Sequence, residues 1–236
     1  MLAATRAAGV DVSAMEIVAG AATAGYTALL DPAGNLVVAF ADMAIYDGFD
    51  GARVAEAAAG AIRWFVDANL PATAIAAIAA SKPDGCLLAA DAVSVAKSER
   101  LQGVLPALDL LFASRDEAVA LTGLGDPAAA AARLRMAGVG AVVVTLGAGG
   151  ALVDDDAGVT SLAAAPAAIH DVTGAGDALI AATLDGLDRG QALVAAVRRG
   201  IVAAALTIAK QGAVRPDLAM ALAASCPAPD RPPYAR

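Results

Sequence analysis

The sequence predicts an α/β fold, a mainly parallel sheet with helices on both faces. Apolar runs of strand length alternate with helix-like segments through the middle of the chain. The 236 residues suffice for one sizeable domain with its own core. Hydrophobic residues make up 59% and aromatic residues only 3%, which favours alanine-rich helices packed closely on a sheet. We therefore expect a single domain over residues 1–225, followed by a proline-rich, frayed tail over residues 226–236.

Two β-hairpins are predicted, one before the alternation and one within its second half. Residues 26–30 and 36–41 are apolar runs that flank a turn, and we expect this first hairpin to lie outside the main sheet. Residues 149–153 and 159–162 form the second. The three acids between them, Asp154, Asp155 and Asp156, are interpreted as a solvated turn, because such turns are far commoner than metal sites.

The alternation itself gives four strands and four helices in order. The strands are predicted over residues 62–67, 86–91, 108–112 and 141–145, and the helices over 73–80, 96–105, 115–121 and 127–137. Pro127 suits a first helical position after Asp126 as the cap. Beyond Asp177 the chain is expected to be mostly helical to about residue 224.

Residues 171–177 (DVTGAGD) are the most informative segment, because a glycine-rich turn leads there into an apolar helix. Gly174 and Gly176 let backbone N–H groups face a bound anion, and the helix adds its positive end. A carboxylate at Asp177 would repel a phosphate unless it accepts the proton of an attacking hydroxyl. The segment predicts an anion hole and a base for phosphoryl transfer. Taken alone, it is equally compatible with a plain helix start capped by Thr173 or Asp177.

This segment resembles the C-terminal signature of the ribokinase-like (PfkB) sugar and nucleoside kinases. Residues 142–151 (VVVTLGAGGA) are similar to the nucleotide-side strand and turn of that family. Residues 114–123 resemble its Asn-x-x-Glu segment, with Ser114 in place of Asn. The resemblance runs from about residue 9 to about residue 215. It implies a ribokinase-like fold with a small β lid at about residues 24–42, and transfer of the γ-phosphoryl group of ATP to a sugar or nucleoside hydroxyl.

The same resemblance implies a role for each candidate residue. Asp177 would be the general base and Gly174, Ala175 and Gly176 the anion hole. ATP would be bordered by Thr145, Gly147, Gly150 and Ser114. Glu117 would help to hold Mg²⁺ through water, and Asp171 with the carbonyl of Thr173 would take part in a monovalent-cation (K⁺) site.

Alternatives stay open for several of these residues. Glu117 could instead be an exposed residue at a helix N-terminus, favoured by the helix dipole. The hydroxyl of Ser114 has a shorter reach and fewer hydrogen-bond partners than an Asn amide. Lys97 could reach a phosphate, although a solvated helix position is favoured. We interpret His170, the single histidine, as structural.

Within the family, residues 23–26, 36–46, 67–70 and 93–97 are most similar to the pseudouridine kinases. This similarity implies conversion of pseudouridine to its 5′-phosphate, with ribose, another sugar or adenosine as open alternatives. Family members carry an N-terminal segment ahead of residue 9, with the first core strand, part of the lid and an acidic sugar ligand. The expectation is therefore weak substrate binding and low activity, or a catalytically silent nucleotide-binding remnant.

Composition and charge indicate which classes of binding partner this chain is expected to lack. The net charge is −8 and Lys and Arg form no cluster, which argues against nucleic-acid binding. No uncharged apolar run reaches the ~18 residues of a spanning helix, and no signal peptide is recognisable, so a cytoplasmic location is expected. Cys86 is expected to be a buried thiol. The resemblance makes a homodimer through the lid one candidate assembly, although the sequence itself does not give the oligomeric state. A Rossmann-type dehydrogenase is disfavoured, because the glycine-rich segment lies near the C-terminus.

Overall fold

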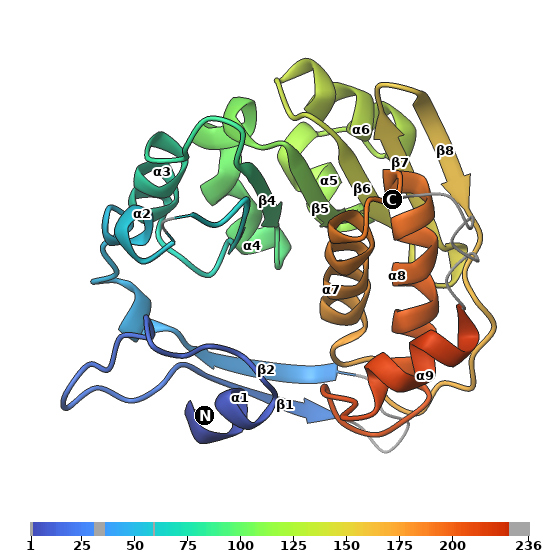
Figure 1. Cartoon of the computed structure of the whole chain (residues 1–236). Helices are drawn as coiled ribbons and strands as arrows, with labels where there is room; N and C mark the ends of the chain where they lie inside the picture. Colours follow the sequence, from blue (N-terminus) through green and yellow to red (C-terminus); the bar gives the residue numbers. More distant parts are fainter. Residues whose placement is uncertain (1, 31–35, 59, 227–236) are drawn as a thin grey trace, which may run out of the picture. The chain divides into compact units, whose positions relative to one another are not determined.

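The computed structural model describes residues 2–30, 36–58 and 60–226 (Figure 1). The predicted turn over residues 31–35 and all but the first residue of the predicted tail lie outside these described residues. The chain divides into two compact units, Met1–Val142 and Val143–Arg236, and each is considered by itself.

The first unit contains five strands and most of the shorter helices. In order these are α1 (Leu2–Ala7), β1 (Gly25–Leu30), β2 (Leu36–Asp42), the 3₁₀ helix η1 (Ala44–Tyr46), α2 (Arg53–Ala57), β3 (Arg63–Asp67), α3 (Ala72–Ala80), β4 (Leu87–Asp91), α4 (Val95–Ser98), the 3₁₀ helix η2 (Glu99–Ala107), β5 (Leu110–Ser114), α5 (Arg115–Thr122) and α6 (Pro127–Met136). Helices α1 and α2 were not expected from the sequence; at six and five residues they are too short to carry a periodic signal.

The second unit begins within a strand and ends in three helices. Its elements are β6 (Val142–Thr145), the 3₁₀ helix η3 (Gly147–Gly149), β7 (Ala151–Asp155), β8 (Gly158–Leu162), α7 (Ala175–Asp188), α8 (Leu193–Ile208) and α9 (Leu218–Ser225).

The strands form two sheets. Strands β1 and β2 make a separate antiparallel pair, with Tyr26 opposite Ala41, which confirms the first predicted hairpin and its place outside the main sheet. The order of the larger sheet is β3-β4-β5-β6-β7-β8. Strand β4 pairs in parallel with β3 and β5, and β7 pairs with β8 in antiparallel fashion. The predicted α/β class, a parallel sheet with a small β hairpin, is thus confirmed.

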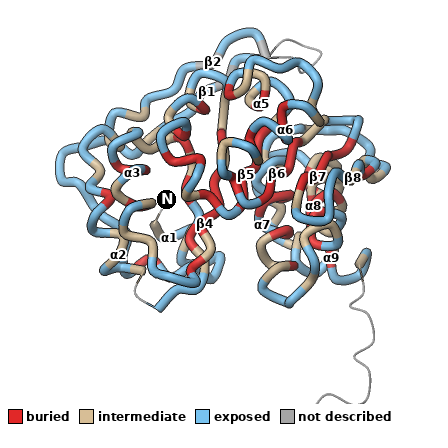
Figure 2. The backbone as a smooth tube through the Cα atoms, turned by 90° about the horizontal axis from the view of Figure 1, so that it is seen from above, coloured by how far each residue is buried: buried red, intermediate tan, exposed pale blue. Residues whose placement is uncertain are grey.

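The core of the first unit lies along β4 and β5. Figure 2 shows buried backbone positions along these strands. Leu88, Leu111 and Phe112 are fully buried there, together with Ile75 and Ile78 of α3. Almost every residue of β5 is buried, as expected of a parallel strand covered on both faces. The predicted burial of Cys86 is confirmed.

The predicted helix over residues 96–105 is only partly correct. A single α-helical turn, α4, passes into the 3₁₀ helix η2, which extends to Ala107. Pro106 within η2 has no N–H to donate, and Gly103 lowers the helix propensity of the segment. Strand β5 consequently begins at Leu110, two residues later than predicted.

Small side chains let the helices of the second unit pack closely. Ala178 and Ala182 of α7, Ala203 of α8 and Leu222 of α9 form one buried cluster. No helix of the described residues is long and apolar enough to cross a membrane.

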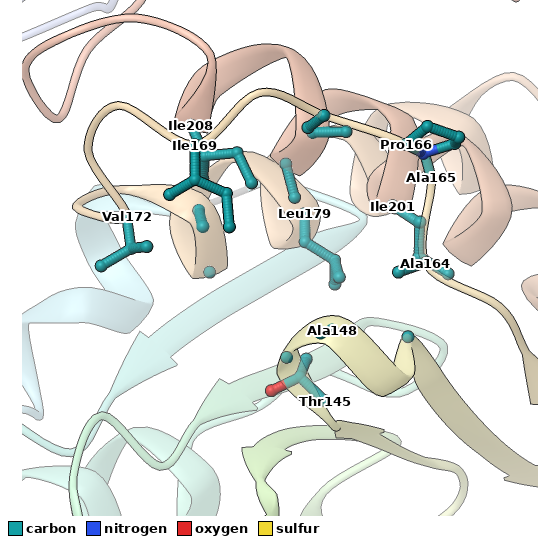
Figure 3. Close-up of a pocket in the computed structure, with 17 residues that line it drawn as sticks. Thr145, Ala148, Ala164, Ala165, Pro166, Ile169, Val172, Leu179, Ile201 and Ile208 are labelled. Atoms are coloured by element: carbon teal, nitrogen blue, oxygen red, sulfur yellow. The ribbon is translucent and has the colours of Figure 1, made fainter.

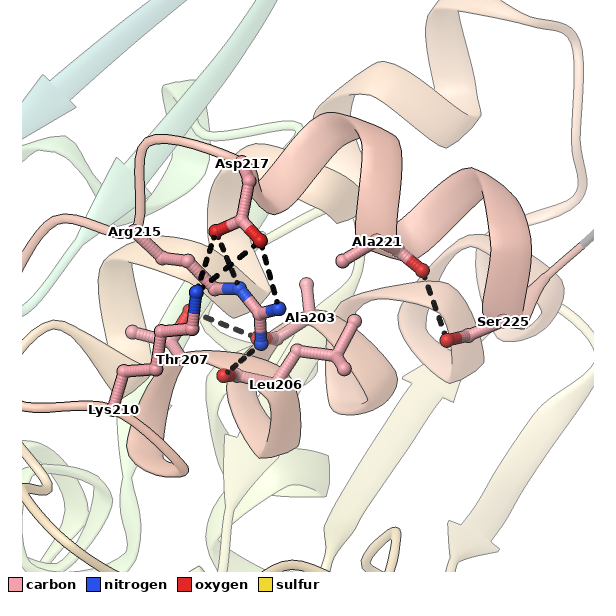
Figure 4. A network of polar contacts seen from close by, with 8 residues as sticks. All are labelled: Ala203, Leu206, Thr207, Lys210, Arg215, Asp217, Ala221 and Ser225. Atoms are coloured by element: carbon pink, nitrogen blue, oxygen red, sulfur yellow. Dashed lines mark hydrogen bonds and ion pairs between the residues drawn. The ribbon is translucent and has the colours of Figure 1, made fainter.

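An ion-pair network joins the end of α8 to the start of α9 (Figure 4). The Arg215 guanidinium donates from Nε and Nη2 to the two carboxylate oxygens of Asp217, at 3.0 and 3.1 Å, and from Nη1 to the Leu206 carbonyl at 2.7 Å. Lys210 donates to the same carboxylate at 3.1 Å. Arg215 and Lys210 together hold the pKa of Asp217 well below its usual range.

The second predicted hairpin is present as β7 and β8, but its acidic turn is tighter than expected. Asp154 is buried within β7, which corrects the prediction that all three acids are solvated. Asp155 accepts a hydrogen bond from the Ala157 N–H at 2.9 Å, and Asp156 is exposed. The described residues hold no group of three or more His, Cys, Asp or Glu side chains that could hold a metal ion.

Candidate active site

Helix α7 begins earlier than the sequence suggested. Gly174 is its N-cap residue, and the Ala178 N–H donates to the Gly174 carbonyl at 2.9 Å. Gly176 therefore lies inside the first helical turn rather than in the preceding loop, and Asp177 is the third helical residue. The left-handed backbone of Gly174, at φ +80°, ends the loop and sets the start of the helix.

The two glycines of the motif are required for different reasons. A Cβ on Gly174 would meet the carbonyl oxygen of Ala213 well inside contact distance, so this glycine is needed by the fold. A Cβ on Gly176 would meet no atom within 4 Å. Packing therefore gives no reason for a glycine at position 176, which leaves room for a ligand as the reason.

The N-terminus of α7 is open to an anion. No side chain caps it, so the sequence alternative in which Thr173 or Asp177 acts as the cap is wrong. Within the described part of the chain, the N–H groups of Gly176 and Asp177 have no hydrogen-bond acceptor. Unpaired amides and the positive end of the helix dipole attract negative charge at this point.

Asp177 is exposed in the first turn of α7, as predicted. Its carboxylate makes no hydrogen bond to the other described residues, so it is available to a ligand. An acidic side chain beside a helix end that could bind an anion suits a proton acceptor, provided that an attacking hydroxyl comes within hydrogen-bond reach.

A cavity of about 530 Å³ lies beside this helix end, entirely within the second unit (Figure 3). Leu179 of α7 lies on one side of it, and Thr145 and Ala148 on the facing side. The lining residues are almost all apolar and small: Thr145, Gly147, Ala148, Gly150, Ala164, Ala165, Pro166, Ala167, Ile169, Val172, Ala175, Gly176, Leu179, Ile201, Ala204, Ala205 and Ile208. The cavity thus joins the two glycine-rich segments that the sequence singled out, since Thr145, Gly147 and Gly150 meet Ala175 and Gly176 there.

The turn after β6 is fixed by the backbone. Gly150 has φ +87°, and a Cβ there would collide with the Leu162 carbonyl. The Leu146 N–H donates to the Gly150 carbonyl at 2.8 Å. The turn is therefore rigid, and it holds Gly147 and Ala148 at the cavity wall.

Asp171 ties together the two loops that precede α7 and α9. Its carboxylate accepts a hydrogen bond from the Thr173 N–H at 2.9 Å and another from the Gly212 N–H at 3.0 Å. The bond from Thr173, and then that from Gly212, lowers the pKa of Asp171 from its ordinary value. The carboxylate therefore has a structural role in holding the start of the motif.

This arrangement predicts a pH dependence. Because the pKa of Asp171 is lowered on folding, its contribution to stability is present above the ordinary pKa of 3.8 and is lost as the pH falls through the lowered value. We expect Asp171→Asn to melt at a lower temperature than the unchanged protein at pH 7, and the gap to narrow as the pH falls toward 3. Thermal unfolding of both proteins from pH 7 to pH 3 tests this prediction. A difference in melting temperature that does not change with pH would contradict the stabilising role of the ionised Asp171 carboxylate.

Ser114 and Glu117, both in the first unit, form a reciprocal capping box at the start of α5. The Ser114 N–H donates to Glu117 Oε2 at 2.7 Å, and the Glu117 N–H donates to Ser114 Oγ at 3.3 Å. The pair caps two otherwise unpaired N–H groups. Glu117 is thus half-buried and engaged, rather than an exposed residue favoured by the dipole alone.

Lys97 is not the solvated helix residue that the sequence favoured. It is half-buried, and its Nζ lies 2.5 Å from Asn69 Oδ1. Arg100 donates to the backbone carbonyls of Ala68 and Asn69 at 3.0 and 2.9 Å. The Lys97 contact joins residues 67–70 to residues 93–97, two of the segments noted in the sequence without a chemical role.

Most of the cavity wall was not predicted from the sequence. Residues 163–169 follow β8 without regular structure and supply five lining residues, and Val172, Leu179 and Ile208 complete the apolar wall. An apolar segment of seven residues with no helix or strand period, immediately before the glycine-rich motif, is the signal that could have identified it.

The chain is similar to known kinases. The model of the "pfkB family carbohydrate kinase" matches residues 1–219. Fructoselysine 6-kinase of Shigella flexneri is 39% identical over 115 residues, which are 48% of this chain and 41% of that relative, so the match spans less than half of its length. Pseudouridine kinase of Escherichia coli K12 is 29% identical over 233 residues, 94% of this chain and 73% of the relative.

Solved structures agree in fold. A carbohydrate kinase from Agrobacterium tumefaciens superimposes with a TM-score of 0.71 at 34% identity, over 87% of this chain and 69% of that one. A Burkholderia thailandensis nucleoside kinase, in complex with inosine, gives a TM-score of 0.75 at 18% identity, over 95% and 75% of the two chains. From the match over residues 1–219, this chain belongs to the pfkB family of carbohydrate kinases.

Proposed function

We propose that the protein is an ATP-dependent kinase that phosphorylates a hydroxyl of a sugar or nucleoside. The observation that carries this proposal is the uncapped N-terminus of α7, with Asp177 in its first turn, beside an apolar cavity of about 530 Å³. An anion site, a proton acceptor and an apolar pocket are the three parts that nucleotide-dependent phosphoryl transfer requires.

In the proposed reaction, the cavity holds the base and ribose of ATP. The anion hole was expected from Gly174, Ala175 and Gly176, but the Ala175 N–H donates to the Val172 carbonyl at 3.3 Å. The amides of Gly176 and Asp177 therefore receive the transferred phosphoryl group and stabilise the charge that develops on it. The Asp177 carboxylate accepts the proton of the acceptor hydroxyl as that oxygen attacks the γ-phosphorus and the bond to ADP breaks. Positioning and electrostatic stabilisation supply the rate.

Pseudouridine is the proposed acceptor, giving pseudouridine 5′-phosphate. The support is the match to pseudouridine kinase over 94% of the chain, at 29% identity. The match to fructoselysine 6-kinase is stronger per residue but covers 48% of the chain, so a fructosamine-type sugar is the second candidate. Ribose and adenosine are the other two acceptors to be tested.

The test is release of ADP from Mg²⁺-ATP in the presence of each acceptor. Release that depends on pseudouridine supports the proposal and its substrate. Release that depends on another acceptor would support the kinase proposal with that acceptor as the substrate. Binding of ATP without release with any acceptor would indicate a silent nucleotide-binding protein and overturn the proposal.

Mg²⁺ is the proposed partner of the phosphates, and Glu117 is the proposed carboxylate that holds it through water. An oxygen donor of this kind fits Mg²⁺, which keeps part of its hydration shell. We expect Glu117→Gln to retain the capping box, because Gln also serves at that position, but to raise the Mg²⁺ concentration needed for half-maximal rate about tenfold. Thermal unfolding and a Mg²⁺ titration separate the two roles. A loss of stability with an unchanged Mg²⁺ requirement would leave Glu117 a purely structural residue.

K⁺ is proposed as an activator bound near Asp171 and the carbonyl of Thr173. The support is the resemblance of residues 171–177 to the signature of the ribokinase-like kinases, in which Asp171 stands two residues before Thr173. Rates measured in K⁺ and in Na⁺ at equal ionic strength test this role, and equal rates would exclude it.

A homodimer through the β1–β2 hairpin is the proposed assembly. Leu29 and Phe40 are more than half exposed on this two-stranded sheet, where they lie on the same face with Val38. Apolar side chains on a small sheet favour burial against another surface. We expect the unchanged protein to sediment as a dimer and Phe40→Asp as a monomer. A monomer in both cases would contradict the proposal.

A further inference from the structure

The wall of the cavity offers almost no side chain that could read the polar edge of a base. Of the 17 lining residues, only Thr145 carries a polar side-chain group, its hydroxyl (Figure 3). The lining contains no charged, amide or aromatic side chain. A ring bound there is held by contact with aliphatic groups.

The backbone of residues 163–169, here called the pocket loop, lies along the same cavity and is not committed to other bonds. Within the described part of the chain, none of its N–H or C=O groups makes a hydrogen bond. Both donors and acceptors are therefore available along it. The edge of adenine presents a donor amino group, whereas that of guanine presents an acceptor carbonyl at the same place. Because the pocket loop carries unpaired groups of both kinds, its backbone gives no reason to prefer adenine over guanine.

Two apolar side chains that line the cavity are left largely uncovered by the described residues. Ile169 is 68% exposed and Val172 is 66% exposed, although both line the cavity. Exposed apolar groups around a hollow are typical of a surface that a ligand covers.

We propose that this cavity selects the phosphoryl donor by the shape of its base and not by the polar substituents, so that GTP and ITP bind nearly as well as ATP. The inference rests on the proposed kinase function and specifies its donor. Sites that hydrogen-bond a substrate group reject analogues lacking it by large factors, whereas apolar pockets discriminate weakly between rings of similar shape. Purine nucleotides bind more tightly than pyrimidine nucleotides, because the larger ring covers more of the apolar wall.

The experiment measures the dissociation constants of Mg²⁺-ATP, Mg²⁺-GTP, Mg²⁺-ITP and Mg²⁺-CTP by calorimetry, with no acceptor present. We expect the three purine nucleotides to agree within about tenfold and CTP to bind at least about tenfold more weakly. ATP that binds more than about a hundredfold tighter than GTP would overturn the inference while leaving the kinase proposal intact. Binding of none of the four nucleotides would overturn this inference, and ADP release with the panel of acceptors would then decide the kinase proposal separately.

Ile169→Ala provides a second test, and Ile62→Ala its matched control. Both side chains are strongly exposed, at 68% and 74%, so both variants are expected to fold, but Ile62 lies outside the cavity. We expect Ile169→Ala to weaken the binding of ATP and of GTP by the same factor, about tenfold, because the variant lacks an aliphatic contact common to all bases. Ile62→Ala is expected to change neither affinity. A loss of affinity for one purine nucleotide only would show that the cavity recognises the substituents of the base and would overturn the inference.

Discussion

Replacing Asp177 by Asn is expected to lower kcat by about 10³-fold or more, the range for loss of a general base. Asparagine keeps the size and polarity of the side chain but cannot accept the hydroxyl proton at neutral pH. Affinity for ATP is expected to stay the same or to rise slightly, because the carboxylate no longer repels the phosphates at the helix end. The measurement is single-turnover phosphoryl transfer, with the ATP dissociation constant determined separately.

Asp84→Asn is a suitable control for this variant. Asp84 is an exposed carboxylate in the turn before β4, so its replacement changes the net charge equally without touching the site. If Asp177→Asn and Asp84→Asn retain equal rates, Asp177 is not the base. Loss of ATP binding in Asp177→Asn, with a normal thermal unfolding curve, would instead assign the residue to nucleotide binding.

Gly174→Ala is expected to destabilise the second unit by about 2–5 kcal/mol. A left-handed backbone costs an alanine about 1–2 kcal/mol, and the clash of its Cβ with the Ala213 carbonyl adds an overpacking cost of about 1–3 kcal/mol. The start of α7 would shift, and with it the amides that receive the phosphoryl group. Urea-induced unfolding gives the free energy directly.

Gly176→Ala is the informative comparison, because its Cβ would point into open space. We expect its stability to equal that of the unchanged protein or to exceed it by up to about 1 kcal/mol, since alanine favours a helix over glycine. Its KM for ATP is expected to rise, because the added methyl group stands where the phosphate approaches. A stable variant with unchanged ATP kinetics would remove Gly176 from the anion site.

Several elements followed directly from local sequence patterns. The apolar runs of β3 to β6 and the cap at Asp126, whose carboxylate accepts the Ala129 N–H at 2.8 Å, are local features that depend on few other residues. The helix before β5 was predicted less well, because Pro106 and Gly103 disfavour the α-helix there and because Arg100 donates to the distant carbonyls of Ala68 and Asn69. A local sequence pattern does not reveal hydrogen bonds to the backbone carbonyls of distant segments.

The sequence by itself determined the fold class, the glycine-rich anion motif and the position of Asp177 in a first helical turn, because these depend on period, on turn residues and on a short motif. Only the tertiary structure decided which glycine the fold requires, since that depends on the approach of Ala213, some forty residues along the chain. It likewise showed that Ser114 and Glu117 cap each other, and that the pocket loop joins α7 and α8 in forming one apolar cavity. Contacts between distant segments set these features, and no local pattern records them.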